Sequence, residues 1–187
     1  MGILGFFRKK DEVVGARVLV GTLDSRFDDL LRADTETYKR YYPATTATTF
    51  VNIDELMKAI TQGYDAVHLL FDVSASGAIG GTEITGTELI ESCCASNVKL
   101  LWIASSNAAE GYIKGFKARG KRLNLVMTVS RQGLKFSSFL EKLLARMSHG
   151  DAMPVAWKML CPQVPGRGHP DSPAAIFFAG RGSVRLR

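Results

Sequence analysis

Short runs of consecutive apolar residues alternate along this chain with longer segments whose apolar positions recur at helical spacing. The most informative run is Leu100–Ala104, five apolar residues followed by Ser105 and Ser106. Such a run is typical of a strand that is covered on both faces in a parallel sheet. Ligands and nucleophiles sit at the carboxyl ends of such strands, so the serines are candidate site residues. The alternative is that they cap a helix that begins near Ala108.

The same apolar pattern predicts the remaining elements of the fold. Further strands are expected at Arg17–Gly21, Ala44–Asn52, Tyr64–Phe71, Leu123–Val129 and Ala175–Ala179. Helical spacing predicts helices at Ile53–Gln62, Thr85–Ser96, Ala108–Arg119, Phe136–Met147 and Met153–Leu160, and one helix followed by an irregular segment within Phe27–Tyr41. Strands that alternate with helices indicate an α/β fold, with a mainly parallel sheet of about five to six strands and helices on both faces.

Composition favours one soluble domain. The chain has 187 residues, 46% of them hydrophobic and 22% charged. We expect a flexible arm over residues 1–15 and a single domain over 16–187, which includes a Pro/Gly-rich loop at 162–173 and a basic C-terminal tail. No apolar run approaches the roughly 20 residues of a transmembrane helix.

The cysteines and charges narrow the classes of ligand. Cys93, Cys94 and Cys161 lack the spacing of a metal site or a disulfide framework, so we expect a cytoplasmic location with no metal and no cofactor. The net charge of +6 is moderate, and no aromatic residues interleave with the basic clusters. Nucleic acid is therefore not an expected partner.

Met1–Lys10 places apolar residues before basic ones, which fits either weak contact with a membrane surface or a partly ordered arm.

Two further features have competing interpretations. The glycine-rich stretch Gly77–Thr82 follows a predicted strand and precedes a helix, as a phosphate cradle would. It lacks the lysine of a P-loop and the GxGxxG spacing of a dinucleotide turn, so a surface loop is the other interpretation. His68 lies in mid-strand among apolar neighbours, which favours a histidine of the core over a catalytic one.

Two stretches of this chain resemble the motifs of a known family. Tyr64-Asp65-Ala66-Val67-His68-Leu69 and the stretch Leu101–Gly111 are similar to "YD(I/V)VHFAGHG" and "L(V/L)VLNAC.SAEG" of CHAT domains, which are relatives of caspases and separase. The resemblance covers Arg17 to Gln163, is most specific at Ser106–Gly111, and includes a match of Gly150–Trp157 to the family's "G.PVAEALR" region. It implies a caspase-like three-layer sandwich.

This chain departs from the family at both catalytic positions. Counting from His68 places Asp72 where the family has its general-base histidine, and Ser106 stands where the family has its cysteine nucleophile. A thiol with a pKa near 8.5 ionises readily, whereas a serine hydroxyl needs a well-placed base. A carboxylate, with an ordinary pKa of about 3.9, is a poor base for that purpose. His68 cannot replace it, because four residues along a strand span about 13 Å.

The resemblance and its departures together predict a catalytically inactive pseudopeptidase. Such a domain would act as a protein-interaction or regulatory module, for example in bacterial defence or signalling, and its partner would be a protein. The residues expected around its cleft are His68, Asp72, Ser105, Ser106 and Asn107. One alternative is an α/β enzyme that binds a small molecule or a nucleotide through Gly77–Thr82 and the two serines. Another is a weak serine hydrolase with Ser106 as its nucleophile.

Overall fold

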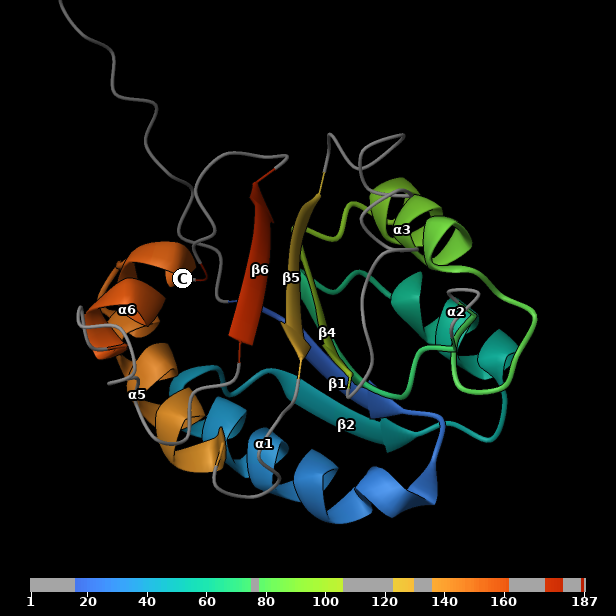
Figure 1. Ribbon diagram of the computed structural model, residues 1–187, viewed down its shortest axis with the longest axis horizontal. Helices are drawn as coiled ribbons and strands as arrows, with labels where there is room; N and C mark the ends of the chain where they lie inside the picture. The colour runs from blue at the N-terminus through green and yellow to red at the C-terminus, as the bar shows by residue number, and fades with distance from the viewer. Residues whose placement is uncertain are drawn as a thin grey trace, which may run out of the picture.

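The chain folds into an α/β sandwich around one six-stranded sheet (Figure 1). The computed structural model describes residues 16–74, 78–105, 123–129, 136–161, 174–179 and 186. The strands are β1 (Val18–Thr22), β2 (Thr45–Thr49), β3 (Ala66–Leu70), β4 (Leu100–Ser105), β5 (Asn124–Val129) and β6 (Ala174–Ala179). The described helices are η1 (Ser25–Phe27), α1 (Asp28–Tyr41), α2 (Ile53–Ile60), α3 (Gly86–Ala95), α5 (Phe136–Ser148) and α6 (Met153–Leu160).

The strand order of the sheet is β2-β1-β3-β4-β5-β6. The first five strands are parallel to one another, and β6 runs antiparallel to β5 at the edge. In the register of β3 and β4, Leu70 lies opposite Ala104. The predicted α/β fold, with a mainly parallel sheet of five to six strands and helices on both faces, is confirmed.

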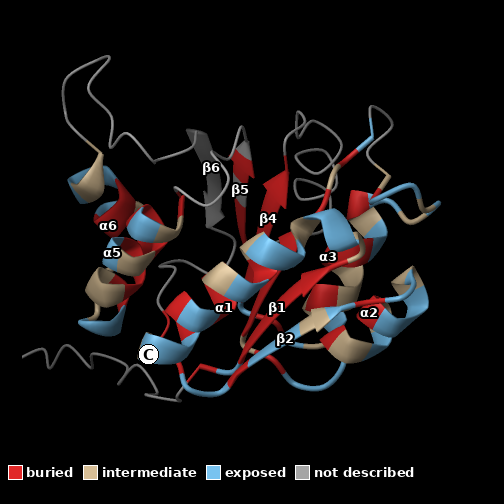
Figure 2. Cartoon of the chain, turned by 90° about the horizontal axis from the view of Figure 1, so that it is seen from below, coloured by how far each residue is buried: buried red, intermediate tan, exposed pale blue. Residues whose placement is uncertain are grey.

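Helices cover the sheet on both faces and bury the strands β1, β3 and β4, whereas the edge strand β2 is largely exposed (Figures 1 and 2). Side chains alternate along β1, so Val18 and Val20 join the core under α1, α5 and α6, whereas Leu19 joins the core under α2 and α3. Every residue of β1, β3 and β4 is buried, which explains why these strands read as continuous apolar runs. At Gly21 an added Cβ would lie 2.8 Å from the ring of Phe50, so a larger residue would disturb this packing.

Helix α1 differs from its prediction. The sequence suggested that an irregular segment follows a short helix, but α1 is continuous from Asp28 to Tyr41. Its buried positions are Leu31, Asp34, Thr35, Thr37 and Tyr38. Several of these are polar, which weakened the apolar periodicity that the prediction used. The hydroxyl of Thr35 donates to the carbonyl of Leu31 at 2.6 Å, so this polar group is satisfied within the helix.

Side chains cap the starts of helices α2 and α3. The side chain of Asn52 accepts a hydrogen bond from the N–H of Glu55 at 3.0 Å. Thr85 and Glu88 form a capping box at the start of α3.

Several predicted features lie outside the described residues. They are the N-terminal arm, the helix predicted at 108–119, the loop at 162–173 and the serine at position 106. Among the described helices, none has the length and apolar character that a membrane crossing requires. The described residues also contain no group of three or more His, Cys, Asp or Glu side chains that could hold a metal ion.

Candidate functional site

The order of the strands identifies one crevice at the carboxyl edge of the sheet. From β1 the chain continues through α1 to the neighbouring strand β2, whereas from β3 it continues through α3 to β4 on the other side. Helices α1 and α3 also cover opposite faces of the sheet. The segments that leave β1 and β3 therefore diverge, and such a switch point is where open α/β sheets bind ligands.

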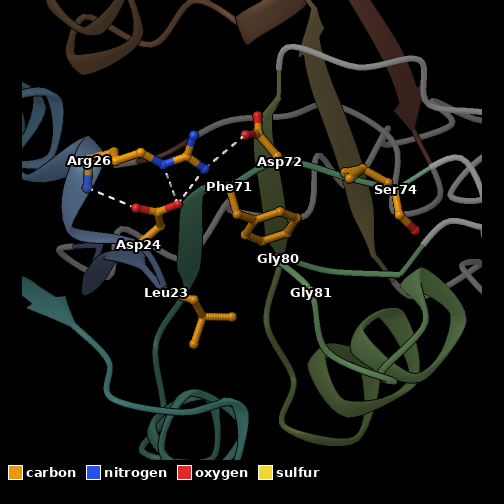
Figure 3. Close-up of a pocket in the computed structure, with 9 residues that line it drawn as sticks. Leu23, Asp24, Arg26, Phe71, Asp72, Ser74, Gly80 and Gly81 are labelled. Carbon is orange, nitrogen blue, oxygen red and sulfur yellow. Dashed lines mark hydrogen bonds and ion pairs between the residues drawn. The ribbon is translucent and has the colours of Figure 1, made fainter.

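A pocket of about 360 Å³ occupies this switch point (Figure 3). Its lining comes from the segment after β1, the segment after β3 and the glycine turn before α3. The residues are Leu23, Asp24, Arg26, Phe71, Asp72, Val73, Ser74, Gly80 and Gly81. Phe71 and Val73 are 1% exposed, so they form a fixed apolar wall. The charged lining residues are more exposed, with side chains that are 29% (Asp24), 71% (Arg26) and 36% (Asp72) exposed, and we call this solvent-open side the mouth of the pocket.

Asp24 and Arg26 form a close ion pair at this mouth. Asp24 caps η1, where its carboxylate accepts a hydrogen bond from the backbone N–H of Arg26 at 2.9 Å. The Arg26 guanidinium returns to the same carboxylate, with Nε at 2.7 Å and Nη2 at 2.5 Å from Oδ2. The side-chain and backbone hydrogen bonds from Arg26 lower the pKa of Asp24, and Asp24 in turn raises the pKa of Arg26. Both groups are therefore charged at neutral pH.

The same guanidinium reaches across the pocket to the segment after β3. Nη2 of Arg26 lies 3.3 Å from Oδ2 of Asp72, which is the longer of its two carboxylate contacts. Figure 3 shows the guanidinium between the two carboxylates. The Arg26 side chain is 71% exposed and that of Asp72 is 36% exposed, so this bridge is open to water. Arg26 thus joins the β1 and β3 segments through a solvent-exposed ion pair.

The glycine turn, which contains Gly80 and Gly81, lines the pocket with its backbone. Gly80 and Gly81 have φ values of 47° and 76°, in the left-handed region that glycine adopts readily. The N–H of Gly80 donates to the carbonyl of Asp72 at 2.9 Å, and the N–H of Thr82 donates to the carbonyl of Ile79 at 2.7 Å. These two donors hold the turn together, so neither is directed at a ligand. Within residues 78–82, the described part of the glycine-rich stretch, these two N–H groups are therefore not available to a phosphate.

The other predicted site residues fall in different places. Ser105 is the last residue of β4, is 3% exposed and does not line the pocket. His68 is 1% exposed in mid-strand, and its ring stacks on Trp102 with centroids 4.4 Å apart. Its burial agrees with the interpretation of His68 as a histidine of the core. Ser106 and Asn107 lie outside the described residues, so the predicted Asp72–Ser106 juxtaposition stays a prediction.

The described residues that line the pocket include no cysteine. All three cysteines are free, but none lines the pocket. Burial, and then the neighbouring Cys94, raise the pKa of the Cys93 thiol, which disfavours its reactive thiolate form.

Sequence reasoning missed the part of the pocket contributed by the segment after β1. Asp24 and Arg26 lie two and four residues after the end of the buried strand β1, which is a usable signal, since polar residues near strand ends often form sites. These two residues can be assigned to the same site as Asp72 only when β1 is known to lie beside β3. That adjacency depends on the strand order, and local patterns do not encode it.

Comparisons with known proteins give distant likenesses. The sequence matches no family model, and no curated protein matches it. The apo-structure of D-lactate dehydrogenase from Escherichia coli is 11% identical, with a TM-score of 0.42, and the match covers 70% of this chain but only 37% of the dehydrogenase. A flavodoxin-like domain from Synechococcus sp. is 18% identical, also with a TM-score of 0.42, and the match covers 69% of this chain and 99% of that domain. At these scores neither likeness carries an argument about function.

Proposed function

We propose that this chain is a non-catalytic, CHAT-like binding domain that holds an extended segment of a partner protein at the carboxyl edge of its sheet. The observation that carries the proposal is the Arg26–Asp72 ion pair at the mouth of the switch-point pocket. Asp72 occupies the position at which the family resemblance expects the general-base histidine. A carboxylate is intrinsically a poor base for a serine hydroxyl, and Oδ2 of Asp72 is in contact with the Arg26 guanidinium.

Neither His68 nor His149 lines the pocket. His68 is in the core, and His149 lies after the end of α5, where its Nδ1 is 2.7 Å from the carbonyl oxygen of Ala145. A peptidase needs a nucleophile and a base within hydrogen-bond reach of each other. Among the described residues that line the pocket there is neither a histidine nor a cysteine. Binding without catalysis is therefore the function that this geometry supports best.

A phosphate-binding enzyme fits the same pocket less well. The start of η1 is already occupied by the carboxylate of Asp24, and two N–H groups of the glycine turn are used within the chain. Two carboxylates at the pocket mouth would also repel an anionic ligand. The three free cysteines suit a reducing compartment, so a cytoplasmic location is part of the proposal.

The absence of catalysis can be tested with a fluorophosphonate probe and a library of fluorogenic peptides. The wild-type chain, Ser106→Ala and Asp72→Asn should behave alike, with no labelling that depends on Ser106 and no peptide hydrolysis. Labelling that disappears in Ser106→Ala would overturn the proposal and favour a serine hydrolase.

Binding can be tested with peptides selected by display on the folded chain. Leu23→Trp should fill the pocket and weaken the selected peptides by about tenfold, an effect of the size expected when one buried contact is lost. Val155→Trp is the matched control, because Val155 is 51% exposed on α6 and does not line the pocket. Equal binding to both variants would remove the pocket from the proposed interface.

A further inference from the structure

Among the described residues that line the switch-point pocket, carboxylates outnumber cations. Asp24 and Asp72 supply two carboxylates, and Arg26 is the only cation among the described residues that line the pocket. The guanidinium is close to Asp24, with contacts of 2.7 and 2.5 Å, and more distant from Asp72, at 3.3 Å. Of the two carboxylates, Asp72 therefore makes the longer and weaker contact with Arg26.

The pocket behind these carboxylates suits an aliphatic stem. Leu23, Phe71 and Val73 line it with apolar groups, and Phe71 and Val73 are almost fully buried. Figure 3 draws Leu23 and Phe71 among the residues that line the pocket together with Asp72. Arginine and lysine side chains combine an aliphatic stem with a charged end, so they match a site with an apolar wall and an acidic rim.

We infer that this pocket receives the cationic side chain of an arginine or lysine from the partner peptide, which takes Asp72 while Arg26 remains on Asp24. The inference deepens the proposed function, on which it rests. Arg26 itself shows that the carboxylate pair accommodates a guanidinium (Figure 3). Its side chain is 71% exposed, so it can withdraw from Asp72 without any rearrangement of the core. Arg26 thus acts as an internal competitor for the same carboxylate.

The competition predicts opposite effects from the two partners of the ion pair. Arg26→Ala removes the competitor and should strengthen the binding of a cationic peptide several-fold. Asp72→Asn removes the acceptor and should weaken that binding by about tenfold. The control pair is Arg40 and Glu141, which form an exposed ion pair at 2.6 Å between α1 and α5. Arg40 lies near the end of α1 that is remote from the pocket, about 18 Å along the helix from Asp28.

The probe is the pentapeptide acetyl-Ala-Ala-Arg-Ala-Ala-amide, titrated against the full chain and followed by NMR chemical shifts. Its citrulline counterpart has the same shape without the charge and should bind at least tenfold more weakly. Arg40→Ala and Glu141→Gln alter the net charge as Arg26→Ala and Asp72→Asn do, and they should leave the affinity unchanged. Free butylguanidine, which carries the guanidinium and an aliphatic stem without a peptide, should bind more weakly than the pentapeptide.

Three results would overturn the inference. They are equal affinities for the arginine and citrulline peptides, an equal gain in affinity from Arg26→Ala and Arg40→Ala, and an affinity for butylguanidine that equals that of the pentapeptide. The last result would assign the pocket to a small free cation. If display-selected peptides without arginine or lysine still depend on Leu23, the inference fails and the proposed function stands. Peptide hydrolysis that depends on Ser106 would instead refute the proposed function.

Discussion

Truncation of His68 tests whether this histidine belongs to the core or to a binding cleft. Its ring lies between two aromatic partners, stacked on Trp102 at 4.4 Å with an interplanar angle of 10° and edge-on to Tyr38 at 5.7 Å. His68→Ala removes both contacts and leaves a void beside the rings of Trp102 and Tyr38. The expected result is a large loss of stability with no direct effect on peptide binding.

The size of the loss follows from these contacts. Each aromatic pair contributes about 0.5–1.5 kcal/mol beyond its buried area, so two pairs account for about 2 kcal/mol. The unfilled volume adds to that loss, because truncation of large core side chains to alanine costs about 2–5 kcal/mol in total. We therefore expect His68→Ala to lower the free energy of unfolding by about 3 kcal/mol. For a chain of this size that corresponds to a fall in Tm of about 9 °C.

Urea unfolding, followed by tryptophan fluorescence, measures this loss. His68→Phe keeps a ring in place and should lose less than half as much. His149→Ala, at an exposed position, should cost less than about 1 kcal/mol. A change below 1 kcal/mol in His68→Ala would refute the packing argument, and so would weakened peptide binding at unchanged stability.

Two further predictions concern Cys93 and Glu88. Because burial raises the pKa of the Cys93 thiol, a thiol reagent at pH 8 should modify the half-buried Cys161 well before Cys93. Mass spectrometry measures the two rates of modification, and equal rates would contradict the burial of Cys93. Hydrogen bonds from the backbone N–H and then the hydroxyl of Thr85 lower the pKa of Glu88 below 4.5, so its stabilising effect is present above that pH and is lost as the pH falls through the folded-state value. Glu88→Ala should thus lower Tm at pH 7 and converge with the wild-type chain in acid, and a difference that persists at low pH would refute the assigned cause.

The sequence was sufficient to predict the class of fold, because a strand that is buried on both faces consists of consecutive apolar residues. Leu100–Ala104 reads as apolar at every position, and all of these residues are buried in β4. The second half of α1 was harder, since its buried face includes Asp34 and Thr37, whose polarity conceals the helical period. The antiparallel direction of β6 is a matter of topology and has no local signature in its apolar run.

The candidate site was predictable in part. Asp72 could be placed at the end of a strand from the sequence, because the apolar run before it ends at Phe71. Its ion pair with Arg26 could not, since the two residues are 46 positions apart and meet only because β1 and β3 are neighbours. Side-chain contacts between segments depend on the strand order, and periodicity within each segment does not report it.

The placement of the two tryptophans has an optical consequence. Trp102 and Trp157 are the only tryptophans of the chain, and their rings lie 5.9 Å apart in the core beneath α1, α5 and α6. Tryptophan fluorescence therefore reports on this half of the sandwich and does not detect loosening of α2 or α3. A probe on the opposite layer, where Tyr64 is buried, would be needed to detect a domain that melts from one side first.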